Sequence, residues 1–79
     1  MKRYRITLDT MSAVNKFVEI ATRYKDFKIK LTDGEDYTVN GKSLLGAAYT
    51  IEWNKIYCLV PEDCDIYNDI EEFIIEEDE

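Results

Sequence analysis

The chain has 79 residues, of which 46% are hydrophobic and 34% charged, and its formal net charge is −7. This length suits one small domain, residues 1–79, and the composition excludes a disordered or low-complexity segment. The chain contains two cysteines and no histidine, so it cannot form a disulfide scaffold or a four-ligand zinc site by itself.

The charges are distributed unevenly along the chain. Residues 1–60 carry a net charge of +3, whereas residues 61–79 contain ten acidic side chains and no basic one. Because the acidic part repels phosphate backbones, we expect no nucleic-acid ligand, while the basic part favours an acidic or phosphorylated protein partner. The longest nearly apolar run is far shorter than the roughly 20 residues that a membrane-spanning helix needs. We therefore expect a cytoplasmic protein.

The first predicted elements are a strand and a helix. Tyr4, Ile6 and Leu8 alternate with polar residues, which predicts a strand with one buried face and one cationic face. Ser12 is then predicted to cap a helix that extends to about residue 24. The apolar positions of this helix follow one helical face and are Val14, Phe17, Val18, Ala21 and Tyr24.

A predicted hairpin follows the first helix. Phe27, Ile29 and Leu31 alternate with polar residues, and the alternation resumes at Tyr37 and Val39. Between the two runs, residues 33–34 have the sequence Asp-Gly, which favours the positive φ angles of a tight turn. The sequence therefore predicts two antiparallel strands joined by a short connection.

The last predicted elements are a helix, a strand and a second helix. Ser43 is predicted to cap a helix of about two turns over residues 44–50, and residues 55–60 are predicted to form a strand that ends at Pro61. Asp63 or Asp65 is predicted to cap a final helix with an acidic outer face. Its apolar stripe consists of Ile66, Ile70, Phe73 and Ile74.

The predicted element order is β-α-β-β-α-β-α. A domain of this size can bury such elements only by placing its helices together on one face of a sheet. The sequence therefore predicts an α+β open-faced sandwich with a four-stranded, mainly antiparallel sheet and three helices on one face.

Two segments resemble the HPr family, the small phosphocarriers of the bacterial sugar phosphotransferase system. Residues 39–46, with the sequence Val-Asn-Gly-Lys-Ser-Leu-Leu-Gly, are similar to the regulatory segment of that family, and Ser43 falls on its regulatory serine. Residues 10–15 occupy the place of the family's phosphorylated segment. There Ser12 replaces the phosphorylated histidine, Val14 replaces an arginine, and Asn15 follows it. The predicted element order also agrees with an HPr-like fold.

The missing histidine decides what this resemblance implies. Phosphoryl transfer by the family needs an imidazole nitrogen, whereas a serine phosphate is an ester that is too stable to pass its group onward. The resemblance thus implies a degenerate phosphocarrier site without catalysis, no metal and no cofactor. It implies instead a regulatory or adaptor protein of the phosphotransferase system or of carbon catabolite control, in which a serine kinase modifies Ser43. The residues expected to contact partners are Lys16, Lys42, Leu44, Leu45 and Ala48.

Three alternatives stay open at this level. Ser43 can act only as a helix cap, because serine is favoured at any N-cap position. The protein can be a constitutive interaction module that forms a homodimer through the open sheet face or an edge strand. The least favoured alternative is a working phosphocarrier, which the absence of an imidazole opposes.

Overall fold

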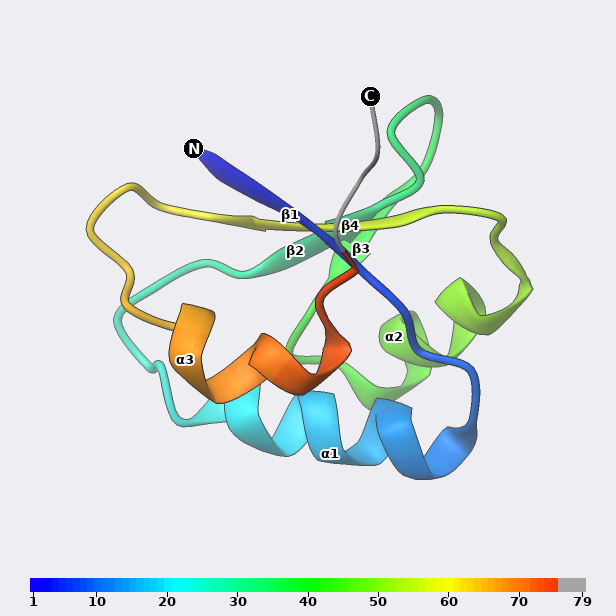
Figure 1. Ribbon diagram of the computed structural model, residues 1–79, viewed down its shortest axis with the longest axis horizontal. Helices are drawn as coiled ribbons and strands as arrows, with labels where there is room; N and C mark the ends of the chain where they lie inside the picture. Colours follow the sequence, from blue (N-terminus) through cyan, green and yellow to red (C-terminus); the bar gives the residue numbers. More distant parts are fainter. Residues whose placement is uncertain (76–79) are drawn as a thin grey trace.

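The computed structural model describes residues 1–75 and has an α+β fold, with helices on one face of an antiparallel sheet (Figure 1). The strands are β1 (Lys2–Ile6), β2 (Lys30–Thr32), β3 (Thr38–Asn40) and β4 (Ile56–Val60). The α-helices are α1 (Met11–Thr22), α2 (Leu44–Tyr49) and α3 (Tyr67–Ile70). The 3-10 helices η1 (Thr50–Glu52) and η2 (Glu71–Phe73) continue α2 and α3. The predicted fold class and element order are confirmed.

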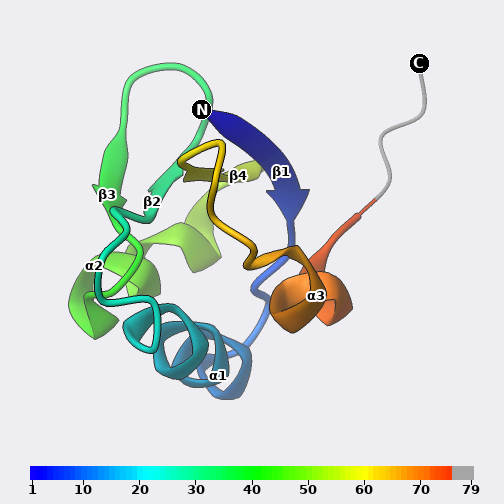
Figure 2. The ribbon, with the colours of Figure 1, turned by 90° about the vertical axis from the view of Figure 1, so that its left-hand side faces the viewer.

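The strand order in the sheet is β1-β4-β2-β3, and every pair of neighbours is antiparallel. Figure 2 shows the three α-helices gathered beneath this sheet. The segment after η2 returns to β1, where Ile74 forms an isolated antiparallel bridge with Ile6 and the Ile75 N–H donates to the Arg5 carbonyl at 2.9 Å. This segment covers part of the β1 edge, whereas β3 lies at the other edge of the sheet.

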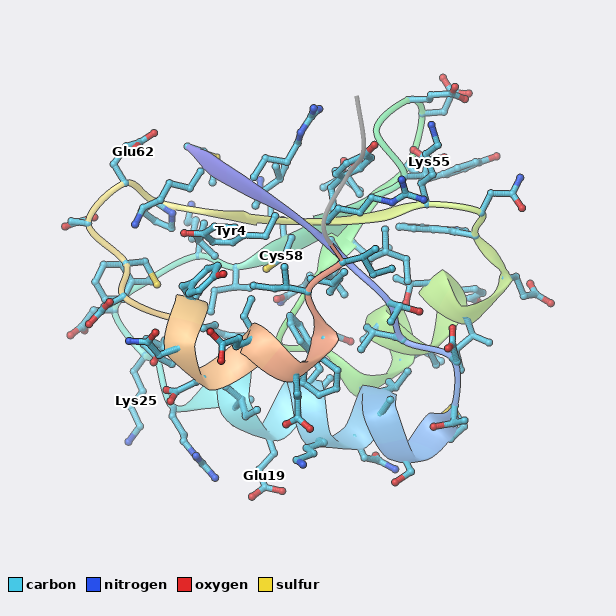
Figure 3. The ribbon with its side chains drawn as sticks, in the orientation of Figure 1. Tyr4, Glu19, Lys25, Lys55, Cys58 and Glu62 are labelled. Atoms are coloured by element: carbon cyan, nitrogen blue, oxygen red, sulfur yellow. The ribbon has the colours of Figure 1, made fainter. Side chains whose placement is uncertain are left out.

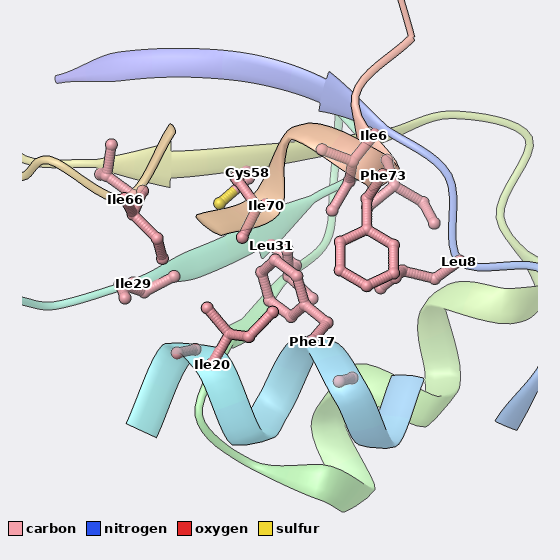
Figure 4. Close-up of a cluster of buried hydrophobic side chains, with 14 of the residues drawn as sticks. Ile6, Leu8, Phe17, Ile20, Ile29, Leu31, Cys58, Ile66, Ile70 and Phe73 are labelled. Atoms are coloured by element: carbon pink, nitrogen blue, oxygen red, sulfur yellow. The ribbon is translucent and has the colours of Figure 1, made fainter. Parts of the chain in front are cut away.

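The hydrophobic core fills the space between the sheet and the helices (Figure 4). Phe17 of α1 is fully buried, and its ring contacts the Phe73 ring edge-on, with 5.9 Å between the centroids. The sheet supplies Ile6, Leu31 and Cys58 to the same cluster. Ile66 and Ile70 are also buried, so the apolar stripe predicted for the last helix does face the core.

The prediction that Ser12 caps α1 is wrong. The N-cap is Thr10, whose backbone is extended and whose Oγ1 accepts a hydrogen bond from the Ala13 N–H at 3.1 Å. An N-cap side chain must reach the free N–H two or three residues ahead, and Thr10 is the residue in this position. Ser12 is the second residue of the helix and is exposed. The helix also ends at Thr22, before the predicted end.

The Thr10 cap should contribute to the stability of the domain. We expect Thr10→Ala to lower the free energy of unfolding by about 1 kcal/mol, because the Ala13 N–H loses its acceptor. Ser12→Ala is the matched control and should change stability by less than about 0.5 kcal/mol, as exposed positions usually do. Urea denaturation of both variants measures the difference. An equal loss in the two variants would contradict the assignment of the cap.

The connection between β2 and β3 is longer than the predicted tight turn. Gly34 has the expected positive φ of 86°, but five residues separate the strands because the Asp33 carboxylate organises a wider loop. Its Oδ1 accepts the N–H groups of Glu35, Asp36 and Tyr37 at 2.9, 3.0 and 3.1 Å. These donors favour the charged form and lower the pKa of Asp33. Tyr37, where the predicted alternation resumes, lies in this loop before β3 and is 63% exposed.

The start of the last helix also differs from the prediction. Neither Asp63 nor Asp65 caps it, because the N-cap residue is Ile66 and no side chain bonds there. The helix is one α-helical turn, followed by the 3-10 turn η2. The buried Ile66 and Ile70 hold this short element against the core, which compensates for the missing cap.

Candidate functional site

The connection from β3 to α2 is held by three hydrogen bonds. The Gly41 N–H donates to the Ile29 carbonyl at 2.8 Å, which joins the connection to the start of β2. Asn40 accepts twice, its Oδ1 from the Lys42 N–H at 2.8 Å and its carbonyl from the Ser43 N–H at 3.1 Å. The chain therefore enters α2 in one defined conformation, which positions Ser43.

Ser43 is the N-cap of α2, as predicted. Its backbone is extended, with φ −100° and ψ 122°, and its Oγ accepts a hydrogen bond from the Gly46 N–H at 3.1 Å. The Ser43 residue is half-buried, so part of it remains accessible to solvent. The predicted modification site is therefore also a structural cap, and both roles use the same oxygen.

The residues that follow Ser43 expose apolar side chains. Leu44 is 46% exposed and Leu45 is 72% exposed, so two of the predicted partner-contacting residues do face solvent. Ala48 is half-buried and packs against the core, which leaves little of its side chain for a partner. Met11, at the start of α1, is 47% exposed and was not predicted. The sequence signal that could have identified Met11 is its position directly before Ser12.

The two predicted partner-binding lysines already have partners within the domain. The Lys42 ammonium donates to the Tyr24 carbonyl, directly after α1. Lys16 forms an exposed ion pair with Glu72 of η2, with 3.0 Å between Nζ and Oε2. Exposed ion pairs of this kind are weak, so Lys16 can exchange this contact. Within residues 1–75, neither ammonium forms a hydrogen bond with the Ser43 hydroxyl group.

Tyr24 connects the end of α1 to the acidic α3. Its hydroxyl group donates a hydrogen bond to the Asp69 carboxylate. This bond and partial burial raise the pKa of Tyr24 to about 12, because a phenolate would face the Asp69 charge. The Tyr24 carbonyl also accepts a hydrogen bond from the Lys42 ammonium. Tyr24 therefore links the β3–α2 connection to the end of α1 and to α3.

The three residues of the predicted degenerate phosphocarrier site do not form one group. Ser12 and Asn15 are exposed and three residues apart, which places them on the same face of α1. Val14 is fully buried and belongs to the core. This burial agrees with the place of Val14 on the predicted apolar face of the helix.

No cluster that could hold a metal ion occurs within residues 1–75. Cys58 and Cys64 are free and buried, and burial raises the pKa of Cys58 to about 12, far from the range of a reactive thiolate. In the described part of the chain, no helix is long and apolar enough to cross a membrane.

An aromatic pair near the β3 edge was also missed by the sequence analysis. The rings of Tyr37 and Trp53 stack with 6.5 Å between centroids and 24° between their planes. The two residues lie in separate loops, so no local periodicity relates them.

Comparisons with families of known proteins, with curated proteins and with solved structures find no match to this chain.

Proposed function

We propose that this protein is a cytoplasmic regulatory or adaptor module with an HPr-like fold, which binds protein partners through α1 and α2 and is switched by phosphorylation of Ser43. The observation that carries the proposal is a half-buried serine that caps α2, followed directly by the exposed Leu44 and Leu45, in a chain without histidine. The proposal places the protein in a phosphotransferase or catabolite-control network of a bacterium.

The absence of histidine supports a regulatory role over phosphoryl transfer. A phosphocarrier must release its phosphoryl group readily, and a phosphorylated imidazole has a labile N–P bond that allows this. Ser12 lies on the exposed start of α1 but offers only a hydroxyl group. A phosphate on Ser12 would remain as a stable ester, so the α1 end can serve recognition but not a relay.

The exposed apolar side chains support docking at α2. Apolar side chains that are exposed next to each other at the start of a helix can be buried by a partner protein. Such burial is a main source of binding energy at protein interfaces. Phosphorylation of Ser43 would transfer the γ-phosphoryl group of ATP to its Oγ, with ADP leaving and the hydroxyl proton passing to a base of the kinase. The product adds about two negative charges beside Leu44, which changes the partners that this surface can accept.

The first experiment tests Ser43 as the modified residue. The purified protein is incubated with ATP, Mg²⁺ and a serine kinase that acts on HPr proteins, and the site is mapped by peptide mass spectrometry. We expect one phosphate on Ser43, none on Ser43→Ala, and unchanged labelling of Ser12→Ala. Absence of phosphate on Ser43 under conditions that label an HPr control would remove the switch from the proposal.

A second measurement tests the docking surface itself. We expect Leu45→Glu to lower the kcat/KM of the kinase for this protein by about tenfold, the effect of losing about 1.4 kcal/mol of contact energy. Ile75→Glu is the control, because Ile75 is also exposed but lies beside β1, away from α2. Equal effects of the two substitutions would contradict docking at α2.

A further inference from the structure

The β3 strand has one free edge. β3 pairs with β2, and within residues 1–75 no strand pairs with its other side. The Gly41–Ile29 and Asp33–Tyr37 hydrogen bonds set the alternation of the ladder. By this alternation the peptide groups of Thr38 point away from β2, so a backbone donor and a backbone acceptor are available at the edge.

An apolar hollow of about 350 Å³ lies at one end of this edge. Its walls include the stacked rings of Tyr37 and Trp53, and Tyr49 of α2 closes it from the helix side. Tyr37 and Tyr49 are 63% and 60% exposed, so most of each side chain is accessible to a ligand. The hollow can accept one apolar side chain of a ligand and enclose it with aromatic rings.

A basic groove of about 670 Å³ lies at the other end. Four lysines line it, and Asp26 is the one acidic residue among the described lining residues. Lys42 is bound to the Tyr24 carbonyl, whereas Lys25, Lys28 and Lys30 are exposed and form no ion pair within residues 1–75. The groove thus carries a local charge of +3 in a protein whose net charge is −7, which selects an anionic ligand.

The hollow and the groove share Thr38 and Val39, so they meet on β3. We propose that the free edge of β3 binds an extended acidic peptide segment of a partner protein. The peptide adds to the sheet as a further strand through its backbone, places one apolar side chain against Trp53, and directs its carboxylates toward Lys25, Lys28 and Lys30. This site is separate from Leu44 and Leu45.

A peptide fits these features better than a nucleic acid does. A strand edge offers alternating donors and acceptors, which an extended peptide backbone complements and a phosphodiester backbone does not. The ten acidic side chains after residue 60 also repel a polyanion as long as a nucleic acid. A short acidic peptide brings fewer charges and concentrates them where the lysines lie.

The test uses a synthetic peptide with blocked ends and the sequence Glu-Glu-Val-Phe-Val-Glu-Glu. Trp53 is the only tryptophan, so its fluorescence reports on the hollow, while ¹⁵N NMR spectra report on each backbone amide. We expect saturable binding that shifts the amide signals of Thr38 and Asn40 and the indole signal of Trp53. The same peptide with lysine in place of glutamate should not bind.

Three variants make the result decisive. We expect Lys25→Glu to weaken binding about fivefold and Lys55→Glu to weaken it by less than about twofold, because the two substitutions change the net charge equally but only Lys25 lines the basic groove. Figure 3 shows the Lys25 and Lys55 side chains on opposite sides of the molecule. Thr38→Pro removes the N–H that points away from β2 and leaves the hydrogen bonds to β2 in place. We expect this variant to lose peptide binding. Its thermal melting curve should still show a folded domain.

Several outcomes would overturn the proposal. One is an unchanged Trp53 signal at peptide concentrations of about 1 mM, which exceeds the range of useful recognition. Another is equal binding by Lys25→Glu and the wild type. A third is a set of NMR shifts centred on Leu45 instead of Thr38, which would assign the peptide to the α2 surface. Preferential binding of a single-stranded RNA oligonucleotide to the groove would also contradict a peptide ligand.

Discussion

Phe17→Ala is expected to lower the free energy of unfolding by about 4 kcal/mol, the sum of lost burial and the cavity that remains. Phe17 is fully buried between α1 and the sheet, and its ring contacts Phe73. A domain of this length has a total stability of only about 4–12 kcal/mol, so the variant should be close to unfolding at room temperature. Urea denaturation followed by circular dichroism measures the loss.

Leu45→Ala is the control for this prediction. Leu45 is 72% exposed, so its truncation should change stability by less than about 0.5 kcal/mol. The two substitutions therefore separate a core residue from a surface residue of similar hydrophobicity. A loss below about 1.5 kcal/mol for Phe17→Ala would mean that the core closes around the cavity, contrary to the packing described above.

Gly41→Ala is expected to lower the free energy of unfolding by about 2 kcal/mol, because a methyl group does not fit between the β3–α2 connection and β2. An added Cβ would lie 2.9 Å from the Ile29 Cγ2 and 3.0 Å from the Ile29 carbonyl oxygen. That carbonyl accepts the Gly41 N–H, so relieving the contact weakens the hydrogen bond that positions Ser43. Thermal melting and urea denaturation measure the effect.

Gly46→Ala is the matched control. A Cβ there would lie 3.3 Å from the Asn40 carbonyl oxygen and 3.4 Å from the Val39 Cβ, a tight but milder contact. Alanine also favours the helix by up to about 1 kcal/mol relative to glycine, which offsets part of the crowding. The stability of Gly46→Ala should therefore stay within about 1 kcal/mol of the wild type. Equal destabilisation at both positions would contradict the specific clash at Gly41.

The fold could be predicted from the sequence because its strongest signals are local. The period of two at Ile29 and Leu31 and the helical period around Phe17 both identify residues that the structure buries. The N-cap at Ser43 was predicted for the same reason, since a capping serine and the amide that it accepts lie three residues apart. The helix start at Thr10 was missed because Thr10, Ser12 and their neighbours offered two plausible caps within one turn.

The candidate sites could be predicted only in part. The exposure of Leu44 and Leu45 followed from their place after the cap, but sequence position could not show that Lys42 is bound to the Tyr24 carbonyl. Val14 was predicted both on the apolar face of the first helix and at a position of the degenerate site, and the structure buries it in the core. Where motif position and periodicity disagree, burial of an apolar side chain decides, because exposing it costs free energy.

The sequence by itself determined the order of the elements, the faces that they bury and the absence of any imidazole chemistry. These properties depend on residue identity and on spacings of two to four residues. Only the tertiary structure decided that Tyr37, Tyr49 and Trp53 meet at the free edge of β3, beside a basic groove. Contacts between such distant residues depend on which strands pair, and pairing is set by the burial of the whole core and not by any local pattern.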